Sequence, residues 1–256
     1  MTRSIQKLGN ETIWIIGASS GIGEELSAQY ALAGYKVVAS ARRETRLNEL
    51  VSRYNENIAP LVLDINDNVS VQRAVEQLVS KNNLPHTIVI NAGIYTPQSV
   101  DKYLFQNSFD TMNTNYLGVC RILDQLLPHL LRRKKGKIVI VASVAGYQGL
   151  PKSLSYGPSK AALINLAEGL HMELKDKGIH VQVVNPGFVK TPLTQQNRFP
   201  MPFLLDVEKA ASLIRKGIQS DRFEIAFPLP FVLILKTIRL LPYRLSLSLI
   251  RRMTTK

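Results

Sequence analysis

Short apolar runs alternate with helical patterns along most of the chain, and this alternation restricts its fold more than any other feature. Buried strands of a parallel sheet read as continuous apolar runs, and the helices that connect them cover both faces of the sheet. We therefore expect an α/β fold with a doubly wound parallel sheet. The expected strands fall at residues 13–16, 35–40, 60–65, 87–90, 138–142, 180–184 and 223–227.

The length of 256 residues suits one large domain, which we place at residues 1–226, followed by a helical C-terminal extension at residues 227–256. Residues 1–14 contain no apolar segment of the kind found in secretory signals, so we expect a cytoplasmic protein. The single Cys120 allows no internal disulfide, and the four histidines lack metal-ligand spacing. We expect no metal site.

The formal net charge of +13 raises the question of an anionic partner. The densest run of cations, residues 132–137, follows an apolar helical pattern. Cations at this point complement the dipole at the C-terminus of a helix. A basic patch interleaved with aromatic residues is absent from the sequence, as is any nucleic-acid-binding motif. Nucleic acid is therefore not an expected partner.

A glycine-rich turn follows the first expected strand and opens the first expected helix. It reads Gly17-Ala18-Ser19-Ser20-Gly21-Ile22-Gly23. Glycines permit a tight turn and a close backbone approach, so that main-chain N–H groups and the N-terminus of the helix face a pyrophosphate. A turn of this kind between a strand and a helix predicts a dinucleotide site.

The end of the second strand indicates which dinucleotide binds. An acidic residue at this point would bind the ribose hydroxyls of NADH, whereas an arginine pairs with the 2′-phosphate of NADPH. Here the strand is followed by Arg42 and Arg43, with no carboxylate. We therefore expect NADP as cofactor, with NADPH preferred over NADH.

Tyr156 and Lys160 form a candidate proton-transfer pair. Residues at i and i+4 share one face of a helix, so a helix beginning near Tyr156 places both side chains in one cleft. A nearby ammonium favours the phenolate, so we expect Lys160 to lower the pKa of Tyr156. Surface helices often contain such a pair, and it gains meaning only from its neighbours in the fold.

Several polar or turn residues come just after expected strands. Ligands bind outside the carboxyl ends of the strands in parallel sheets. The residues at these positions therefore predict a single site: Gly17, Arg42, Asp64, Asn91, Ser143 and Pro186.

Taken together, these motifs resemble those of the short-chain dehydrogenases/reductases over about residues 9–220. The glycine turn, Asn91-Ala92-Gly93 and the set Asn115, Ser143, Tyr156 and Lys160 match the family in order. Ile16 and Ile90 depart from its usual Thr and Asn. The resemblance implies a Rossmann fold and the following cofactor-binding residues: Gly17, Ser19, Ser20, Gly21, Ile22, Gly23, Arg42, Arg43, Asp64, Ile65, Asn91, Ala92, Gly93, Tyr156, Lys160, Pro186, Gly187, Val189 and Thr191.

A mechanism follows from the chemistry of these residues. Negative charge develops on a carbonyl oxygen as it accepts hydride, and the site has to stabilise and protonate that oxygen. We expect Tyr156 to be the acid, Ser143 to hydrogen-bond the same oxygen, and Lys160 to hold the nicotinamide ribose. The resemblance implies that Asn115 positions a water that links Lys160 to solvent. On residue chemistry alone, Asn115 is a helix-surface amide.

The substrate-facing residues are less defined by the sequence. Gln148 and Leu150, between Ser143 and Tyr156, are candidate substrate-binding residues together with those two. The resemblance implies that residues 192–202 form a mobile lid, here with an apolar entrance.

The C-terminal extension is basic and apolar. Leucine and isoleucine alternate with Lys236 and several arginines, and Pro242 predicts a break between two short helices. The apolar run before Lys236 is much shorter than the roughly 20 residues that span a bilayer. Residues 228–253 therefore suit a membrane interface, at the inner face of a membrane, or a second subunit, or the same chain.

Three functions fit these observations. The first is NADPH-dependent hydride transfer to the carbonyl, or from the secondary alcohol, of a lipophilic small molecule. The second is reduction of a 3-oxoacyl thioester. The third is a regulatory or scaffold protein that binds NADP without catalysis, which the retention of Ser143, Tyr156 and Lys160 disfavours. The family resemblance also implies a homodimer or homotetramer.

Overall fold

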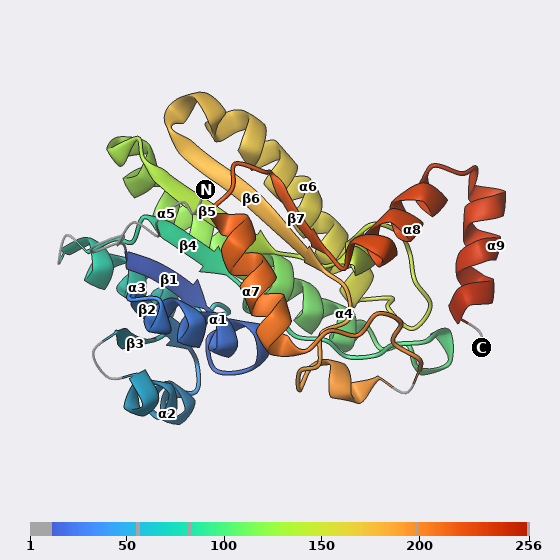
Figure 1. The fold of residues 1–256 in the computed structure, drawn as a ribbon, viewed down its shortest axis with the longest axis horizontal. Coiled ribbons are helices and arrows are strands. Elements are labelled where there is room, and N and C mark those ends of the chain that lie inside the picture. The colour runs from blue at the N-terminus through green and yellow to red at the C-terminus, as the bar shows by residue number, and fades with distance from the viewer. Residues whose placement is uncertain (1–11, 55–56, 81–82, 198, 255–256) are drawn as a thin grey trace, which may run out of the picture.

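The computed structural model describes residues 12–54, 57–80, 83–197 and 199–254, and its centre is a parallel sheet in the order β3-β2-β1-β4-β5-β6-β7 (Figure 1). The expected doubly wound α/β fold is confirmed. Residues 1–11 and Arg198 of the expected lid lie outside the described residues. The strands are β1 (Thr12–Ile16), β2 (Lys36–Ala41), β3 (Ile58–Val62), β4 (Thr87–Ile90), β5 (Gly136–Val141), β6 (Ile179–Pro186) and β7 (Glu224–Phe227).

Helices cover both faces of this sheet. Those whose buried residues pack on one face are α1 (Gly21–Leu32), α2 (Glu44–Tyr54) and α7 (Val207–Ile218). Those on the other face are α3 (Asn68–Ser80), α5 (Gly118–Arg133) and α6 (Tyr156–Leu174). The remaining helices are α4 (Phe105–Met112), α8 (Leu229–Arg239) and α9 (Tyr243–Thr254), with short turns η1 (Val100–Lys102), η2 (Asn113–Leu117), η3 (Val144–Gly146), η4 (Lys175–Lys177) and η5 (Thr194–Gln196).

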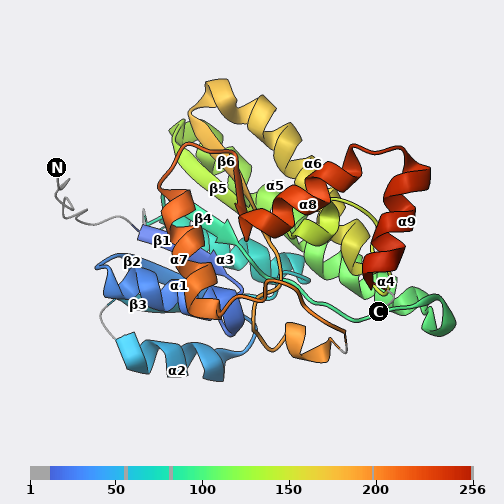
Figure 2. The same ribbon diagram turned by 45° about the vertical axis from the view of Figure 1, so that its right-hand side comes forward.

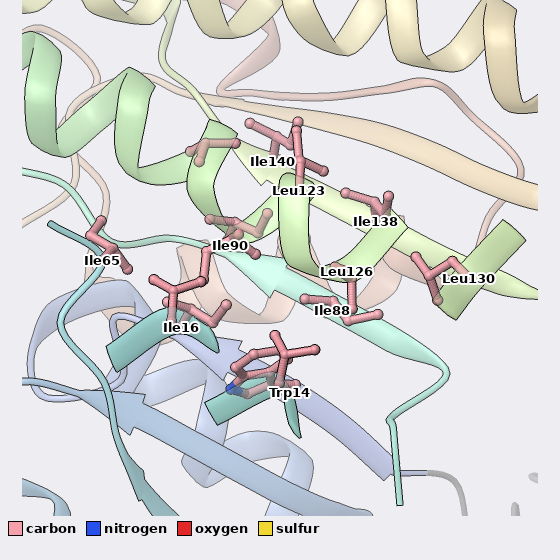
Figure 3. Packing of buried hydrophobic residues seen from close by; sticks show 14 of the residues in the cluster. Trp14, Ile16, Ile65, Ile88, Ile90, Leu123, Leu126, Leu130, Ile138 and Ile140 are labelled. Carbon is pink, nitrogen blue, oxygen red and sulfur yellow. The ribbon is translucent and has the colours of Figure 1, made fainter. Parts of the chain in front are cut away.

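Strand β1 shows why its apolar run is continuous. Ile13 and Ile15 belong to the core under α1, α2 and α7, whereas Trp14 and Ile16 point into the core under α3 and α5. Figure 3 shows this second core around Trp14. Successive side chains of a strand face opposite sides of the sheet, so a strand covered on both sides has no polar face. The buried Trp14 indole donates a 2.8 Å hydrogen bond to Ser40 Oγ.

The order of the strands creates the place for a ligand. The chain moves outward from β1 to β3 and then returns to form β4 on the other side of β1. Helices connecting strands in opposite directions leave a crevice at the carboxyl ends of the two central strands. Gly17 and Asn91 follow β1 and β4 directly, and Asn91 N–H donates to Ile16 C=O at 2.9 Å.

Several expected boundaries differ from the structure by one to three residues. The strand expected at residues 60–65 is β3, which is displaced toward the N-terminus because Ile58 pairs with Val37. Pro60 is tolerated there since β3 is an edge strand. Helix α4 begins at Phe105 and continues through the π-helical turn η2 into α5. Pro186 is the last residue of β6 rather than the first beyond it.

The two C-terminal helices pack on the body of the same chain. Phe231, Val232, Leu235 and Ile238 of α8 and Ile250 of α9 form a buried cluster with Val144 and Tyr147. The expected break at Pro242 is present, between α8 and α9. Each of the helices in the described part of the chain is too short or too polar to cross a membrane.

A polar network fastens α8 to the sheet. Tyr147 Oη donates to Glu224 Oε1 at 2.6 Å, and Asn185 Nδ2 donates to the same oxygen at 2.7 Å. Lys236 of α8 pairs with the other oxygen of Glu224 and lies 5.4 Å from the centroid of the Tyr147 ring. Burial alone would raise the pKa of the Glu224 carboxyl. The hydrogen bonds from Lys236, Tyr147 and Asn185 together outweigh burial and keep this pKa below its ordinary value.

Candidate active site

A cavity of about 360 Å³ lies at the carboxyl ends of the central strands. The structure brings most of the predicted site residues to its wall. These residues are Gly17, Ser19, Ser20, Gly21, Ile22, Arg42, Arg43, Asp64, Ile65, Asn91, Ala92, Gly93, Ser143, Tyr156, Lys160, Pro186, Gly187, Val189 and Thr191. Gly23, Asn115, Gln148 and Leu150 are not part of the wall.

The glycine turn is packed too closely for side chains at its key positions. Gly17 has a φ of +92°, and a Cβ there would lie 2.6 Å from Ala92 N. A Cβ on Gly23 would lie 2.1 Å from the Gly17 carbonyl oxygen. Asn91 Nδ2 donates to this oxygen at 3.1 Å and so holds the turn against β4. Gly23 therefore shapes the turn from behind, while α1 begins at Gly21 on the cavity wall and directs its N-terminus there.

Two arginines stand beside the glycine turn. Arg43 Nη2 donates to Ser19 Oγ at 2.8 Å and reaches Ser20 Oγ at 3.3 Å. Arg42 Nη1 lies 3.9 Å from Asp64 Oδ2, and both side chains of this pair are substantially exposed. Exposed ion pairs of this length contribute little energy, so Arg42 remains available to an anion.

Ser143, Tyr156 and Lys160 meet at the other end of the cavity. Ser143 caps η3 by accepting a hydrogen bond from Ala145 N–H at 3.1 Å, and its hydroxyl donates to Pro186 C=O at 3.3 Å. Tyr156 is the first residue of α6, so one helical turn separates it from the buried Lys160. Lys160 Nζ donates to Val141 C=O at 2.9 Å and lies 5.5 Å from the centroid of the Tyr156 ring.

Burial controls the protonation of this pair. Burial raises the pKa of Tyr156 to about 12, although the Ser143 side chain acts in the opposite direction. Burial also lowers the pKa of Lys160 to about 8. Lys160 was expected to lower the pKa of Tyr156, and the net direction is the opposite because desolvation of the phenolate dominates. The phenol is therefore a proton donor at neutral pH, beside an amine that releases its proton readily.

Asn115 is fully buried in the π-helical turn η2, so the interpretation as a helix-surface amide is wrong. Its Oδ1 accepts from Ile94 N–H at 2.8 Å, and its Nδ2 donates to Ile94 C=O and Ser159 Oγ, each at 3.0 Å. The side chain thus holds Ile94, which lines the cavity, against α6. Extra turns of π-helix are frequent at functional sites. The role of Asn115 in positioning water stays a prediction.

Of the residues expected at the substrate end of the site, Gln148 and Leu150 are not on the cavity wall, whereas part of the expected lid segment is. Leu150 packs against the cluster formed by α8 and α9. In the lid segment, Leu193 and Thr194 line the cavity. The residues that flank this segment are joined by a 2.8 Å hydrogen bond from Lys190 N–H to Leu205 C=O. A Cβ on Gly187, another wall residue, would lie 3.1 Å from Phe231 Cδ1, so α8 lies directly behind the wall.

Asn66 and Thr114 are wall residues that sequence reasoning missed. Asn66 Nδ2 donates to Thr114 Oγ1 at 3.1 Å, which joins the loop after β3 to η2. Both residues directly follow or precede predicted ones in the chain, Ile65 and Asn115. This adjacency is the only signal in the sequence, because the contact between the two loops depends on the fold.

The chain matches a model of the family described as short chain dehydrogenase over residues 11–201. An uncharacterized oxidoreductase of Myxococcus xanthus is 31% identical over 96% of this chain and 99% of the relative. The 11-beta-hydroxysteroid dehydrogenase-like 4A of Arabidopsis thaliana is 35% identical over 72% of this chain and 63% of the relative. The solved structure of ElxO with NADP bound is 28% identical, with a TM-score of 0.75 over 84% of this chain and 97% of that one.

The matched residues include the glycine turn, Ser143, Tyr156 and Lys160, which are also the residues that the fold gathers around one cavity. The chain therefore belongs to the short-chain dehydrogenase/reductase family and is an NAD(P)-dependent oxidoreductase.

Proposed function

We propose that the chain uses NADPH to transfer hydride between the nicotinamide and a carbonyl or secondary alcohol of a lipophilic small molecule. One observation carries this proposal: Ser143, Tyr156 and Lys160 line the same cavity as the glycine turn. A site with a proton donor at one end and a pyrophosphate cradle at the other suits this reaction. The same observation disfavours a scaffold that only binds the cofactor.

The glycine turn and the arginines fit NADPH. Gly17 and Gly23 let the turn pack closely against Ala92 and on itself, and α1 then begins at Gly21 on the cavity wall, where its first backbone N–H groups can approach a pyrophosphate. Arg42 and Arg43 line the cavity with the turn, and they occupy the first two positions after β2, where an acidic side chain would favour NADH. Guanidinium groups bind phosphate through paired hydrogen bonds. The solved structure of ElxO with NADP bound supports this choice of cofactor.

The nicotinamide supplies or accepts the hydride when it is bound. Tyr156 donates its phenolic proton to the oxygen of a carbonyl substrate, and its high pKa keeps that proton in place until negative charge develops. The Ser143 hydroxyl hydrogen-bonds the same oxygen and fixes its position. Lys160, which burial makes easier to deprotonate, binds the ribose and returns a proton to Tyr156. In the direction of oxidation each proton moves the opposite way.

Apolar side chains on and behind the cavity wall favour an apolar substrate. Leu193 and Val189 line the cavity, and Phe231 lies behind Gly187. The Arabidopsis relative, named as a hydroxysteroid dehydrogenase-like protein, supports a lipophilic substrate. Reduction of a 3-oxoacyl thioester remains the alternative substrate class, and a substrate screen separates the two.

The experiment is a cofactor titration followed by turnover. We expect NADPH to bind more tightly than NADH, and Arg42→Ala to lose about 1–3 kcal/mol of NADPH binding while NADH binding is unchanged. Tyr156→Phe should abolish oxidation of NADPH by ketones, aldehydes and acyl thioesters and leave NADPH binding intact. Turnover of the phenylalanine variant near the wild-type rate would rule out the assigned acid. Firm NADPH binding without turnover of any substrate by the wild type would instead favour the scaffold.

We also propose that the chain forms a homodimer or homotetramer through the face of α4 and η2. Phe105, Phe109 and Leu117 are exposed there, and the two phenyl rings lie 6.2 Å apart. Light scattering should show a multiple of the 28.6 kDa chain mass, and Phe105→Ser with Phe109→Ser should shift it to the monomer. A monomeric wild-type chain would contradict this proposal.

A further inference from the structure

The turn between α8 and α9 carries an apolar tip bounded by two cations. Leu240 is 86% exposed and Tyr243 is 82% exposed, more than any other large apolar side chain in the described ranges. Arg239 and Arg244 flank them in the sequence, and both are exposed. Exposing this much apolar surface is unfavourable in water. The tip therefore fits a partner that offers an apolar phase beneath an anionic surface.

The outer faces of the two helices continue this apolar surface. Leu229 and Leu233, four residues apart on α8, are 66% and 62% exposed, whereas the opposite face of α8 is buried in the body. Leu245, Leu249 and Met253 follow the same spacing on α9 and are exposed. Residues four apart lie on one face of a helix, so each helix presents an apolar stripe away from the body.

The charge of this segment has one sign. Residues 225–256 contain six cations and no acidic residue, and so hold +6 of the formal +13 of the whole chain. Lys236 is occupied by Glu224. The other described cations flank the tip or lie in the last turns of α9. Such a combination of apolar stripes and cations is typical of elements that lie in the interface of an anionic bilayer.

We propose that the tip at residues 239–244 and the outer faces of α8 and α9 bind the surface of an anionic lipid bilayer. Leu240 and Tyr243 enter the boundary between headgroups and acyl chains, where amphipathic aromatic rings are favoured. Arg239 and Arg244 bind lipid phosphates on either side. The apolar stripes lie along the interface, which fits helices that are too short to cross it.

A second copy of the chain fits this surface poorly. A two-fold interface brings the same patch of both molecules together, so these arginines would approach one another with no carboxylate on either pair of helices. Anionic lipid neutralises the same cations. The exposed residues that we assign to oligomerisation belong to α4 and η2, not to α8 or α9.

The location of the tip places the cavity near the bilayer. Helices α8 and α9 project beyond the carboxyl ends of the strands in both views (Figures 1 and 2). Helix α8 runs from the tip to Phe231, which contacts the wall of the cavity at Gly187. Membrane binding at the tip therefore brings the substrate end of the site toward the lipid surface.

Vesicle co-sedimentation with the full chain tests this proposal without any measurement of activity. We expect binding to vesicles of phosphatidylcholine with 30% phosphatidylserine at low salt, and weaker binding to pure phosphatidylcholine. The double variant Leu240→Ser with Tyr243→Ser should bind at least tenfold more weakly. Arg239→Gln with Arg244→Gln should weaken the affinity for the anionic vesicles about fivefold for each cation removed, and by a smaller factor at high salt.

Matched controls are available on other surfaces. Leu32→Ser with Val100→Ser removes two apolar side chains of comparable exposure, and Arg73→Gln with Lys209→Gln removes two exposed cations. Neither pair should change binding. Absence of wild-type binding to the anionic vesicles would overturn the proposal, as would equal losses in the controls. A tip variant that changes the oligomeric mass but keeps its lipid binding would show that a second copy occupies the surface.

Discussion

Replacing Lys160 by methionine should stabilise the ligand-free protein at neutral pH while it abolishes turnover. The wild-type chain keeps this amine 4% exposed, and burial lowers its pKa from 10.5 to about 8. Each pH unit of such a change corresponds to about 1.4 kcal/mol, so the buried charge costs the folded state about 3 kcal/mol. Methionine fills a similar volume and favours a helix, and it carries no charge into the core.

The pH dependence of this stability difference shows whether the buried charge of Lys160 causes it. Below pH 8 Lys160 is protonated in both the folded and the unfolded state, so the folded state bears the full cost of the buried charge. Between pH 8 and 10.5 only the unfolded state holds the proton, so the stability of the wild type rises relative to the variant as the pH increases. The cost disappears by about pH 10.5. Loss of the hydrogen bond to Val141 C=O adds a penalty to the variant, but this penalty does not follow the same pH range.

Chemical unfolding at pH 7, 8, 9 and 10.5 measures this difference. The advantage of Lys160→Met over the wild type should fall by about 3 kcal/mol across the range, equivalent to about 6–12 °C in Tm for a chain of this size. Lys209→Met, on the exposed surface of α7, is the control and should change the free energy of unfolding by at most about 0.5 kcal/mol. A gap between Lys160→Met and wild type that stays constant from pH 7 to 10.5 would refute the argument.

Four further substitutions test other parts of the structure. Gly23→Ala should weaken NADPH binding at least tenfold, measured by fluorescence titration, because its Cβ would lie 2.1 Å from the Gly17 carbonyl oxygen; unchanged affinity would contradict the close packing of the turn. Asn115→Leu should reduce the free energy of unfolding by about 2–4 kcal/mol in urea, because it leaves Ile94 and Ser159 without their buried partners; a loss below about 1 kcal/mol would show that these bonds contribute little. Glu224→Gln should lower the Tm by several degrees because it removes the charged partner of Lys236, and Tyr147→Phe should lower it less; equal Tm values for wild type and Glu224→Gln would exclude the network as a fastening of α8.

The sequence was sufficient for the fold because its signals are local. Apolar runs and glycine turns specify strands and crossovers one at a time, and the chirality of βα units leaves few ways to arrange them. The displaced strand β3 shows the limit of this reasoning. Its start depends on pairing with Val37, a contact across the sheet that no local pattern contains.

Some residues of the candidate site could likewise be predicted from local sequence signals, and others could not. Residues at strand ends, such as Ser143 and Arg42, could be predicted because strand ends converge in every parallel sheet. Gln148 and Leu150 were placed near the substrate by sequence proximity alone, and the structure places both outside the cavity wall. The sequence also did not predict that the pKa of Tyr156 is raised, because this shift depends on burial rather than on the neighbouring cation.

The contact between Phe231 and Gly187 means that the wall of the cavity is supported by a part of the chain outside the segment that the family shares. The segment that matches the family model ends at residue 201, whereas the ring that supports the wall at Gly187 comes 30 residues later. Relatives that share every reacting group but differ at the position of Phe231 are therefore expected to differ in the wall at Gly187. Exchange of α8 and α9 between such relatives should change the substrate selectivity and leave the reacting groups unchanged.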